Sequence, residues 1–83
     1  MPFHVYILRS GASGKFYIGH SENLEKRLAE HHHNQVPSTK NRGPWQLVYT
    51  EPFPTRSAAS RREREIKAMK SHGWIEQLAR ASR

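Results

Sequence analysis

Four side chains suited to phosphodiester chemistry are spread along this 83-residue chain. Tyr6 and Tyr17 each lie in a short segment of alternating β type, and Arg27 and Glu63 follow them. Hydrolysis of a phosphodiester needs a group that accepts a proton from water, a positive charge for the developing phosphorane oxygens and usually a metal ion at the leaving oxygen. Two phenols, a guanidinium and a carboxylate from different elements can meet these needs if they converge.

The acid and the cations have distinct expected tasks. Glu63 alone can anchor Mg²⁺ or Mn²⁺, because Mg²⁺ keeps several waters and takes few protein ligands. Tyrosine is a poor base at its reference pKa of about 10, so a phenolate needs cationic neighbours. Arg27 and His31 lie four residues apart on a predicted helix and can supply them from one flank.

Composition points to a polyanionic partner. The chain has 14 Lys and Arg against 7 Asp and Glu, a formal charge of +7, which favours nucleic acid, with DNA as the first candidate. The absence of cysteine excludes disulfides, cysteine-ligated metals and thiol catalysis. No apolar run approaches a signal or membrane segment, so a cytoplasmic protein without a membrane partner is expected. The basic residues expected to contact phosphates are Lys40, Arg42, Arg61, Arg62, Arg64, Lys67 and Lys70.

The chemistry must be positioned by few elements, since a chain of this length makes one domain, residues 1–83, with a small core. Hydrophobic periodicity and turn residues predict strands and helices over residues 3–9, 15–20, 22–32, 45–50, 55–71 and 74–81. Residues 34–44 are too polar and too often broken by Pro and Gly for regular structure, and predict a mobile basic loop. The fold class expected is therefore α+β, with a small three-stranded sheet of antiparallel type flanked by three helices.

The first two strands predict a hairpin in which Tyr6 and Tyr17 share a face. Phe16 and Ile18 then point to the other face, where they join the apolar side chains of the first strand in a core. A plain cross-strand aromatic pair, worth about 0.2 to 1 kcal/mol, is the alternative explanation of the two tyrosines.

Capping residues set the expected helix ends. Ser21 is the predicted N-cap of the first helix, and Thr55 is the predicted N-cap of the second. The second helix is expected to end at His72 and Gly73. On the second helix the expected buried face comprises Ala59, Ile66 and Met69. Glu63 lies about 60° from Ile66 around this helix, which makes it better placed than Glu65 to reach the sheet. Trp45 and Trp74 are expected in the core, and metal binding by His32 or His33 is disfavoured because neighbours on a helix diverge by about 100°.

Six fragments in this order resemble the GIY-YIG nuclease superfamily. They are Val5-Tyr6-Ile7, Phe16-Tyr17-Ile18-Gly19, Arg27-Leu28-x-x-His31, Thr39, Pro44-Trp45-x-Leu47-Val48-Tyr49 and Arg62-Glu63-x-x-Ile66-Lys67. The match is to the compact single-domain branch, similar to the nuclease domain of the excision-repair subunit UvrC. The first motif departs from the family in having His4 and Val5 before its tyrosine, and the residues after His31 depart from the usual turn.

The resemblance implies a metal-dependent endonuclease that cleaves DNA. It implies that Tyr6 is the general base, that Tyr17 orients water or phosphate and that Arg27 stabilises the transition state. It further implies that His31 relays the proton and that Glu63 binds the metal. Two other hypotheses stay open: a non-catalytic module that binds DNA or RNA on the same scaffold, and an interaction module within a larger DNA-repair complex.

Overall fold

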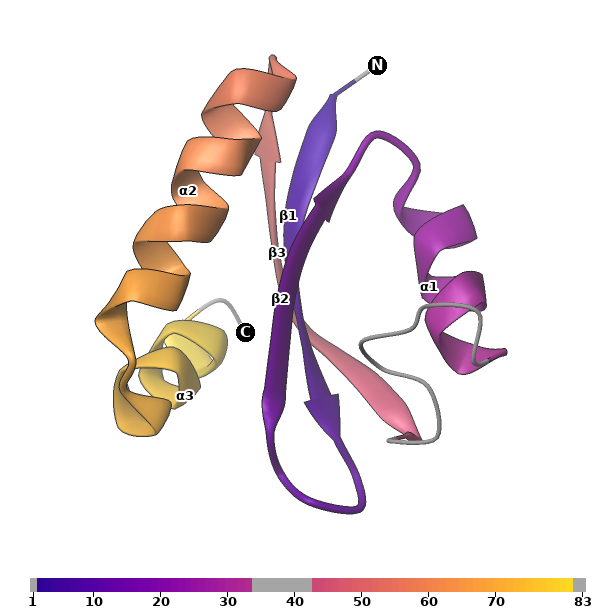
Figure 1. The fold of residues 1–83 in the computed structure, drawn as a ribbon, viewed down its shortest axis with the longest axis vertical. Helices are drawn as coiled ribbons and strands as arrows, with labels where there is room; N and C mark the ends of the chain where they lie inside the picture. Colours follow the sequence, from indigo (N-terminus) through magenta and orange to yellow (C-terminus); the bar gives the residue numbers. More distant parts are fainter. Residues whose placement is uncertain (1, 34–42, 82–83) are drawn as a thin grey trace.

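The computed structural model describes residues 2–33 and 43–81, which form one antiparallel sheet with helices on both faces (Figure 1). The α+β prediction is confirmed. The strand order is β2-β1-β3, so the first strand is central. No helix in the described ranges has the length and apolarity needed to span a bilayer. In chain order the elements are β1 (Phe3–Ser10), β2 (Phe16–Ser21), α1 (Leu24–His32), β3 (Trp45–Phe53), α2 (Arg56–Met69) and α3 (His72–Ala81).

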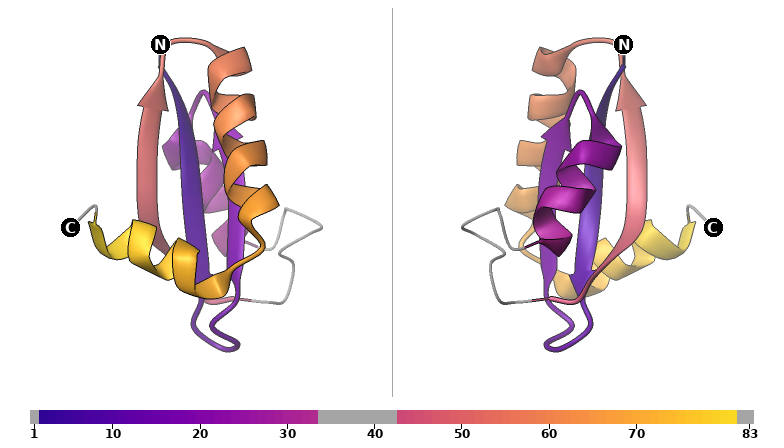
Figure 2. Two further views of the ribbon diagram at one scale, coloured as in Figure 1. Left: turned by 90° about the vertical axis from the view of Figure 1, so that its left-hand side faces the viewer. Right: turned by 90° about the vertical axis from the view of Figure 1, so that its right-hand side faces the viewer.

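The sheet separates two groups of apolar side chains, because alternate residues of a strand point to opposite faces. Helix α1 covers one face, and α2 and α3 cover the other, as the two side views in Figure 2 show. The predicted core is confirmed on the α2 and α3 face, where the buried side chains are Val5, Ile7, Ile18, Ala59, Ile66 and Ile75. The α1 face carries a second cluster, comprising Tyr6, Leu8 and Trp45 with Tyr17, Leu24 and Leu28 packed against it.

Strand β3 is longer than its sequence predicted. It continues through Pro52 to Phe53, and Pro52 pairs with His4 of β1. A proline cannot donate a ladder hydrogen bond, but β3 is an edge strand, where one side of the backbone has no partner strand. Pro52 therefore does not end the strand, and β3 stops at Phe53, directly before Pro54.

The N-terminus of α1 corrects the predicted cap. The helix begins at Leu24, and its N-cap is Asn23, whose Oδ1 accepts a hydrogen bond from the backbone N–H of Lys26 at 3.1 Å. Ser21 instead bonds locally: its hydroxyl accepts from the Asn23 N–H and donates to the Asn23 carbonyl. Both residue types suit a cap, and the local turn of Ser21 delays the helix by two residues.

Helix α2 confirms its predicted N-cap, because the Thr55 hydroxyl accepts from the Ala58 N–H at 3.1 Å. Its end comes earlier than expected, since Lys70 adopts the left-handed conformation with a φ of 48°. Met69, expected in the core, is 46% exposed in this last turn. His72 and Gly73 open α3 rather than end α2, and the Ser71 hydroxyl accepts from the Trp74 N–H.

Two consecutive residues of α2 bind the two edge strands of the sheet. Arg62 Nε donates to the Glu51 carboxylate of β3 at 3.4 Å, and the Tyr49 hydroxyl donates to the same carboxylate. Glu63 binds His20 of β2 at 2.7 Å. The rotation of α2 about its axis is therefore fixed by polar contacts on both sides of its apolar stripe.

Candidate active site

A buried hydrogen bond joins the central strand to the last turn of α1. Tyr6 Oη lies 2.9 Å from Nε2 of His31, and each side chain belongs to a residue only 1% exposed. The Tyr17 ring lies 6.3 Å from the Tyr6 ring and 4.9 Å from the His31 ring, measured between centroids. The predicted shared face of the two tyrosines is confirmed by these distances.

Gly19 of β2 makes room for the Tyr6 ring. Tyr6 and Gly19 are direct partners in the β1–β2 ladder. A Cβ at position 19 would lie 2.7 Å from Oη and 2.8 Å from Cζ of Tyr6, closer than such atoms approach in proteins. The phenol therefore lies flat across the backbone of β2, and any side chain at this position would displace it.

Arg27 lies beside both tyrosines. Burial raises the pKa of Tyr6 to about 12, although a hydrogen bond from Arg27 opposes the rise. Hydrogen bonds with Tyr6 and Tyr17 in turn raise the pKa of Arg27. A guanidinium only donates, so the Tyr6 oxygen accepts from Arg27. The direction of the bond between Tyr6 and His31 depends on the His31 tautomer: the Tyr6 hydroxyl donates to Nε2 when the imidazole carries its proton on Nδ1.

His31 is not the cation that its spacing suggested. Burial and the positive charge of Arg27 lower the pKa of His31 to about 4, so its imidazole is neutral at neutral pH. Among the predicted residues of this cluster, Arg27 alone supplies positive charge to the phenol. His31 offers an acceptor for the phenol proton instead.

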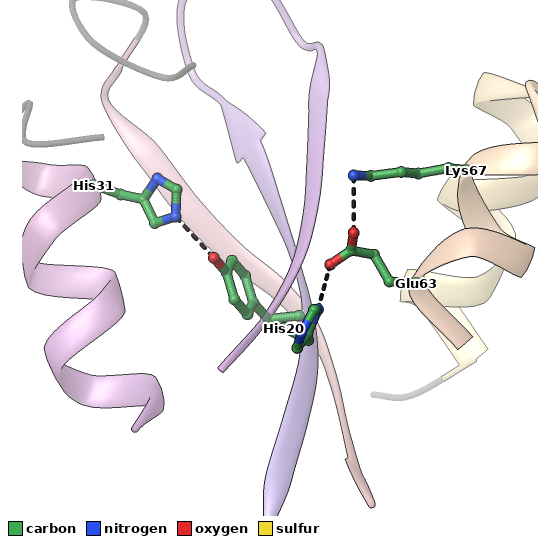
Figure 3. Close-up of polar contacts among 5 residues, drawn as sticks. His20, His31, Glu63 and Lys67 are labelled. Atoms are coloured by element: carbon green, nitrogen blue, oxygen red, sulfur yellow. Dashed lines mark hydrogen bonds and ion pairs between the residues drawn. The ribbon is translucent and has the colours of Figure 1, made fainter. Parts of the chain in front are cut away.

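Glu63 has both carboxylate oxygens engaged. Nδ1 of His20 donates to Oε1 at 2.7 Å, and Nζ of Lys67 donates to Oε2 at 2.9 Å (Figure 3). Burial raises the pKa of the Glu63 carboxyl, but the hydrogen bonds from His20 and Lys67 outweigh it and leave that pKa below its ordinary value. The carboxylate is therefore ionised at neutral pH.

The predicted residues lie on two sides of the sheet. Figure 3 shows His31 on the α1 side and Glu63 with Lys67 on the α2 side, with His20 reaching Glu63 from the sheet. The two parts still interact electrostatically, since the Glu63 charge contributes to the raised pKa of Tyr6. The four residues Tyr6, Tyr17, Arg27 and His31 form one cluster. The contacts of Glu63 that the structure describes are with His20 and Lys67, so the predicted residues do not form a single contact group.

An open cavity of about 440 Å³ lies where these two parts meet. Arg27, which binds the tyrosines, and His20, which binds Glu63, both line it. Lys26 and Arg56 line it as well, and so do the carboxylates Glu30 and Glu22, which pair with Arg27 and Arg56. Because β2 is an edge strand, this cavity is reached from outside the sheet. Arg27 and His20 connect this cavity to the two parts of the site, whereas Tyr6, Tyr17, His31 and Glu63 do not line it.

The donor set fits a divalent ion held through one carboxylate. Among the residues that the structure describes, no three His, Asp or Glu side chains cluster as metal ligands. Mg²⁺ does not require such a cluster, since waters and substrate phosphates complete its shell. Glu63 is ionised and can act as such a ligand.

The predicted phosphate-binding residues differ in their surroundings. Arg61, Arg64, Lys67 and Lys70 are exposed along α2, whereas Arg62 is half-buried and bound to Glu51. Lys40 and Arg42 lie outside the described residues. His32 binds the Trp45 carbonyl through Nε2 at 3.0 Å rather than a metal cluster.

His20 is the site residue that sequence reasoning missed. The alternation of β2 carries a usable signal, because His20 shares a face with Phe16 and Ile18, the face on which α2 packs. A histidine on that face, near the end of the strand, is suited to meet Glu63, the acid of α2 that was predicted to reach the sheet.

Comparison with known proteins identifies the family. A family model for the GIY-YIG catalytic domain matches residues 2–74, almost the whole described chain. The chain belongs to the GIY-YIG family. The GIY-YIG domain family is one of endonucleases, which makes this chain a nuclease-type domain and nucleic acid its expected class of substrate.

The GIY-YIG relatives include UPF0213 proteins from archaea and bacteria. That of Natronomonas pharaonis is 43% identical over 67 residues, covering 80% of this chain and 78% of the relative. That of Staphylococcus saprophyticus is 43% identical over 65 residues, covering 77% and 78%. The solution NMR structure of the UPF0213 protein BH0048 from Bacillus halodurans superposes with a TM-score of 0.60 at 34% identity, covering 98% of this chain and 85% of that one.

Proposed function

We propose that this GIY-YIG domain is a metal-dependent endonuclease that hydrolyses phosphodiester bonds in DNA. The observation that supports it most directly is the cavity lined by both Arg27 and His20, because Arg27 binds the two tyrosines and His20 binds Glu63. The exposed cations of α2 lie on the same side of the sheet as Glu63 and suit the neighbouring phosphates.

In this proposal the phenol and the imidazole move protons together. Tyr6 with a pKa of about 12 is almost wholly protonated at neutral pH, so it cannot act as a preformed phenolate. It can accept a proton from water only while it passes its own to Nε2 of His31 across the 2.9 Å hydrogen bond. A bound phosphodiester adds negative charge nearby, which favours the protonated form of His31.

The remaining groups stabilise charge and orient the substrate. Arg27 donates towards the tyrosines and lines the cavity, so it is placed to bind a non-bridging phosphate oxygen as charge develops there. Tyr17 borders the same cluster and orients water or phosphate. A divalent ion held by Glu63 would supply Lewis-acid stabilisation of the leaving oxygen.

Cleavage of supercoiled plasmid and branched DNA with Mg²⁺ or Mn²⁺ tests the proposal. We expect the wild type to nick DNA in a metal-dependent way and Glu63→Ala to lose cleavage while its far-ultraviolet circular dichroism stays unchanged. Glu65→Ala is the matched control, because Glu65 is an exposed acid on the same helix. Equal nicking by the wild type and Glu63→Ala would expose a contaminating nuclease.

A binding assay separates the enzyme from a scaffold that only binds nucleic acid. Salt-sensitive binding of DNA or RNA with no metal-dependent scission, in a folded wild-type protein, would contradict the catalytic proposal and support the non-catalytic module. Matched DNA and RNA substrates of one sequence decide which nucleic acid is preferred.

A further inference from the structure

Both oxygens of the ionised Glu63 carboxylate already accept a hydrogen bond within the protein. Lys67 donates to Oε2 at 2.9 Å, and His20 donates to Oε1 at 2.7 Å. A divalent ion bound through this carboxylate needs at least one of the two oxygens. An ammonium at hydrogen-bond distance from the same oxygen would also repel the ion strongly. A metal ion therefore competes with these partners for the carboxylate, and most strongly with the charged one, Lys67.

Lys67 is the partner that can leave at little cost. Its side chain is 52% exposed, against 21% for His20, and it forms an i,i+4 pair along the surface of α2. Exposed pairs of this kind contribute little, and the long lysine stem has many alternative rotamers in water. Its ammonium also carries the charge that a metal ion would replace.

His20 has the opposite character. Its short side chain projects from β2, so the backbone that carries it is fixed by the ladder with β1. A neutral imidazole can donate from Nδ1, so its contact with Oε1 does not require a positive charge. The His20 contact is therefore compatible with a metal ion on the other carboxylate oxygen.

We propose that Lys67 is an exchangeable stand-in for the divalent ion, and that His20 is a positioning residue that holds Glu63 both with and without metal. The inference rests on the proposed role of Glu63 as metal ligand. When the ion binds Oε2, Lys67 is released to the surface, where its ammonium becomes free to bind a substrate phosphate. His20 keeps Oε1 fixed, so the carboxylate does not have to be ordered when the metal arrives.

Mn²⁺ titration of the full chain without nucleic acid, followed by the electron paramagnetic resonance signal of free Mn²⁺, tests the exchange. Removing a competing surface ion pair predicts that Lys67→Gln binds Mn²⁺ roughly threefold to fivefold more tightly than the wild type. Arg64→Gln is the matched control, because it removes the same charge from the residue directly after Glu63 in α2. No contact of Glu63 that the structure describes involves Arg64. The proposed exchange would be overturned if both variants gained the same affinity for Mn²⁺, or if Lys67→Gln gained none.

The role of His20 predicts the opposite change. His20→Ala should bind Mn²⁺ at least threefold more weakly, and His20→Asn, which places an amide donor near the position of Nδ1, should recover most of that loss. Long-range ¹H–¹⁵N correlation spectra provide an independent measurement, because the proposal requires a proton on Nδ1 of His20 in the wild type. A bare Nδ1 would refute the positioning role, whatever the affinities of the variants.

Glu63→Ala separates failure of this inference from failure of the proposed function. If this variant binds Mn²⁺ as well as the wild type does, Glu63 is not the metal ligand and the proposed metal role fails. If Glu63→Ala loses Mn²⁺ binding but Lys67→Gln gains nothing over Arg64→Gln, the metal role stands and only the exchange is refuted. Thermal unfolding by circular dichroism identifies any variant whose loss comes from misfolding.

Discussion

The buried neutral His31 predicts a specific loss of stability in acid. The pKa of His31 is about 4 in the folded protein, against about 6.5 for an unperturbed histidine. Below about pH 6.5 His31 is therefore protonated in the unfolded chain but still neutral in the folded one, so the free energy of unfolding falls as the pH decreases. The stabilising contribution is complete above this pH and is lost progressively towards pH 4.

The size of the effect follows from the two pKa values. With a folded pKa of about 4, linkage gives a loss of about 2 kcal/mol between pH 7 and pH 5, and about 3 kcal/mol by pH 4. A domain of this length is expected to have a total stability of about 4 to 12 kcal/mol. The protonation of one histidine therefore removes a large part of it.

Urea denaturation at a series of pH values, for the wild type and for His31→Gln, measures this contribution. The variant cannot ionise at position 31 but keeps a hydrogen-bond acceptor for Tyr6, so other titrating groups contribute similarly to both proteins. We expect the free energy of unfolding of the wild type to fall more steeply below pH 6.5, by the amounts given above. Parallel pH profiles of the two proteins would refute the argument that His31 is buried and neutral.

Four further substitutions have expected outcomes. Gly19→Ala should displace the Tyr6 ring, destabilise the protein by about 1 to 3 kcal/mol and reduce cleavage; a variant of wild-type melting temperature would contradict the tight contact. Thr55→Ala should cost about 1 kcal/mol through loss of the α2 cap, measured by urea denaturation, and an unchanged midpoint would argue against it. Ile66→Ala should cost about 2 to 5 kcal/mol, but Met69→Ala much less because Met69 is exposed; similar melting temperatures for both would mean that the two sites are equally buried.

Local sequence patterns predicted the parts of the fold that depend on local physics. The alternation of residues within β1 and within β2 showed which side chains of each strand share a face, and the predicted hairpin allowed Tyr6 and Tyr17 to lie on the same side of the sheet. The Thr55 cap likewise depends on neighbours three residues away. These features need no knowledge of tertiary contacts.

Features that depend on distant partners were predicted less well. Pro52 belongs to β3 because that strand lies at the sheet edge, and the spacing of Met69 could not reveal that α2 ends there. The neutrality of His31 comes from burial between α1 and the sheet, which the i,i+4 pattern with Arg27 does not reveal. His20 was missed because its partner lies 43 residues away.

The contacts of Arg62 and Glu63 attach α2 to both edge strands of the sheet. One residue binds the outer strand on one side and its neighbour binds the outer strand on the other, with β1 between them. Adding or deleting a single residue earlier in α2 would turn both side chains by about 100° and break both contacts together. The helix therefore tolerates substitutions on its surface far better than changes in its length, and the spacing from Thr55 to Glu63 is itself part of the design of the site.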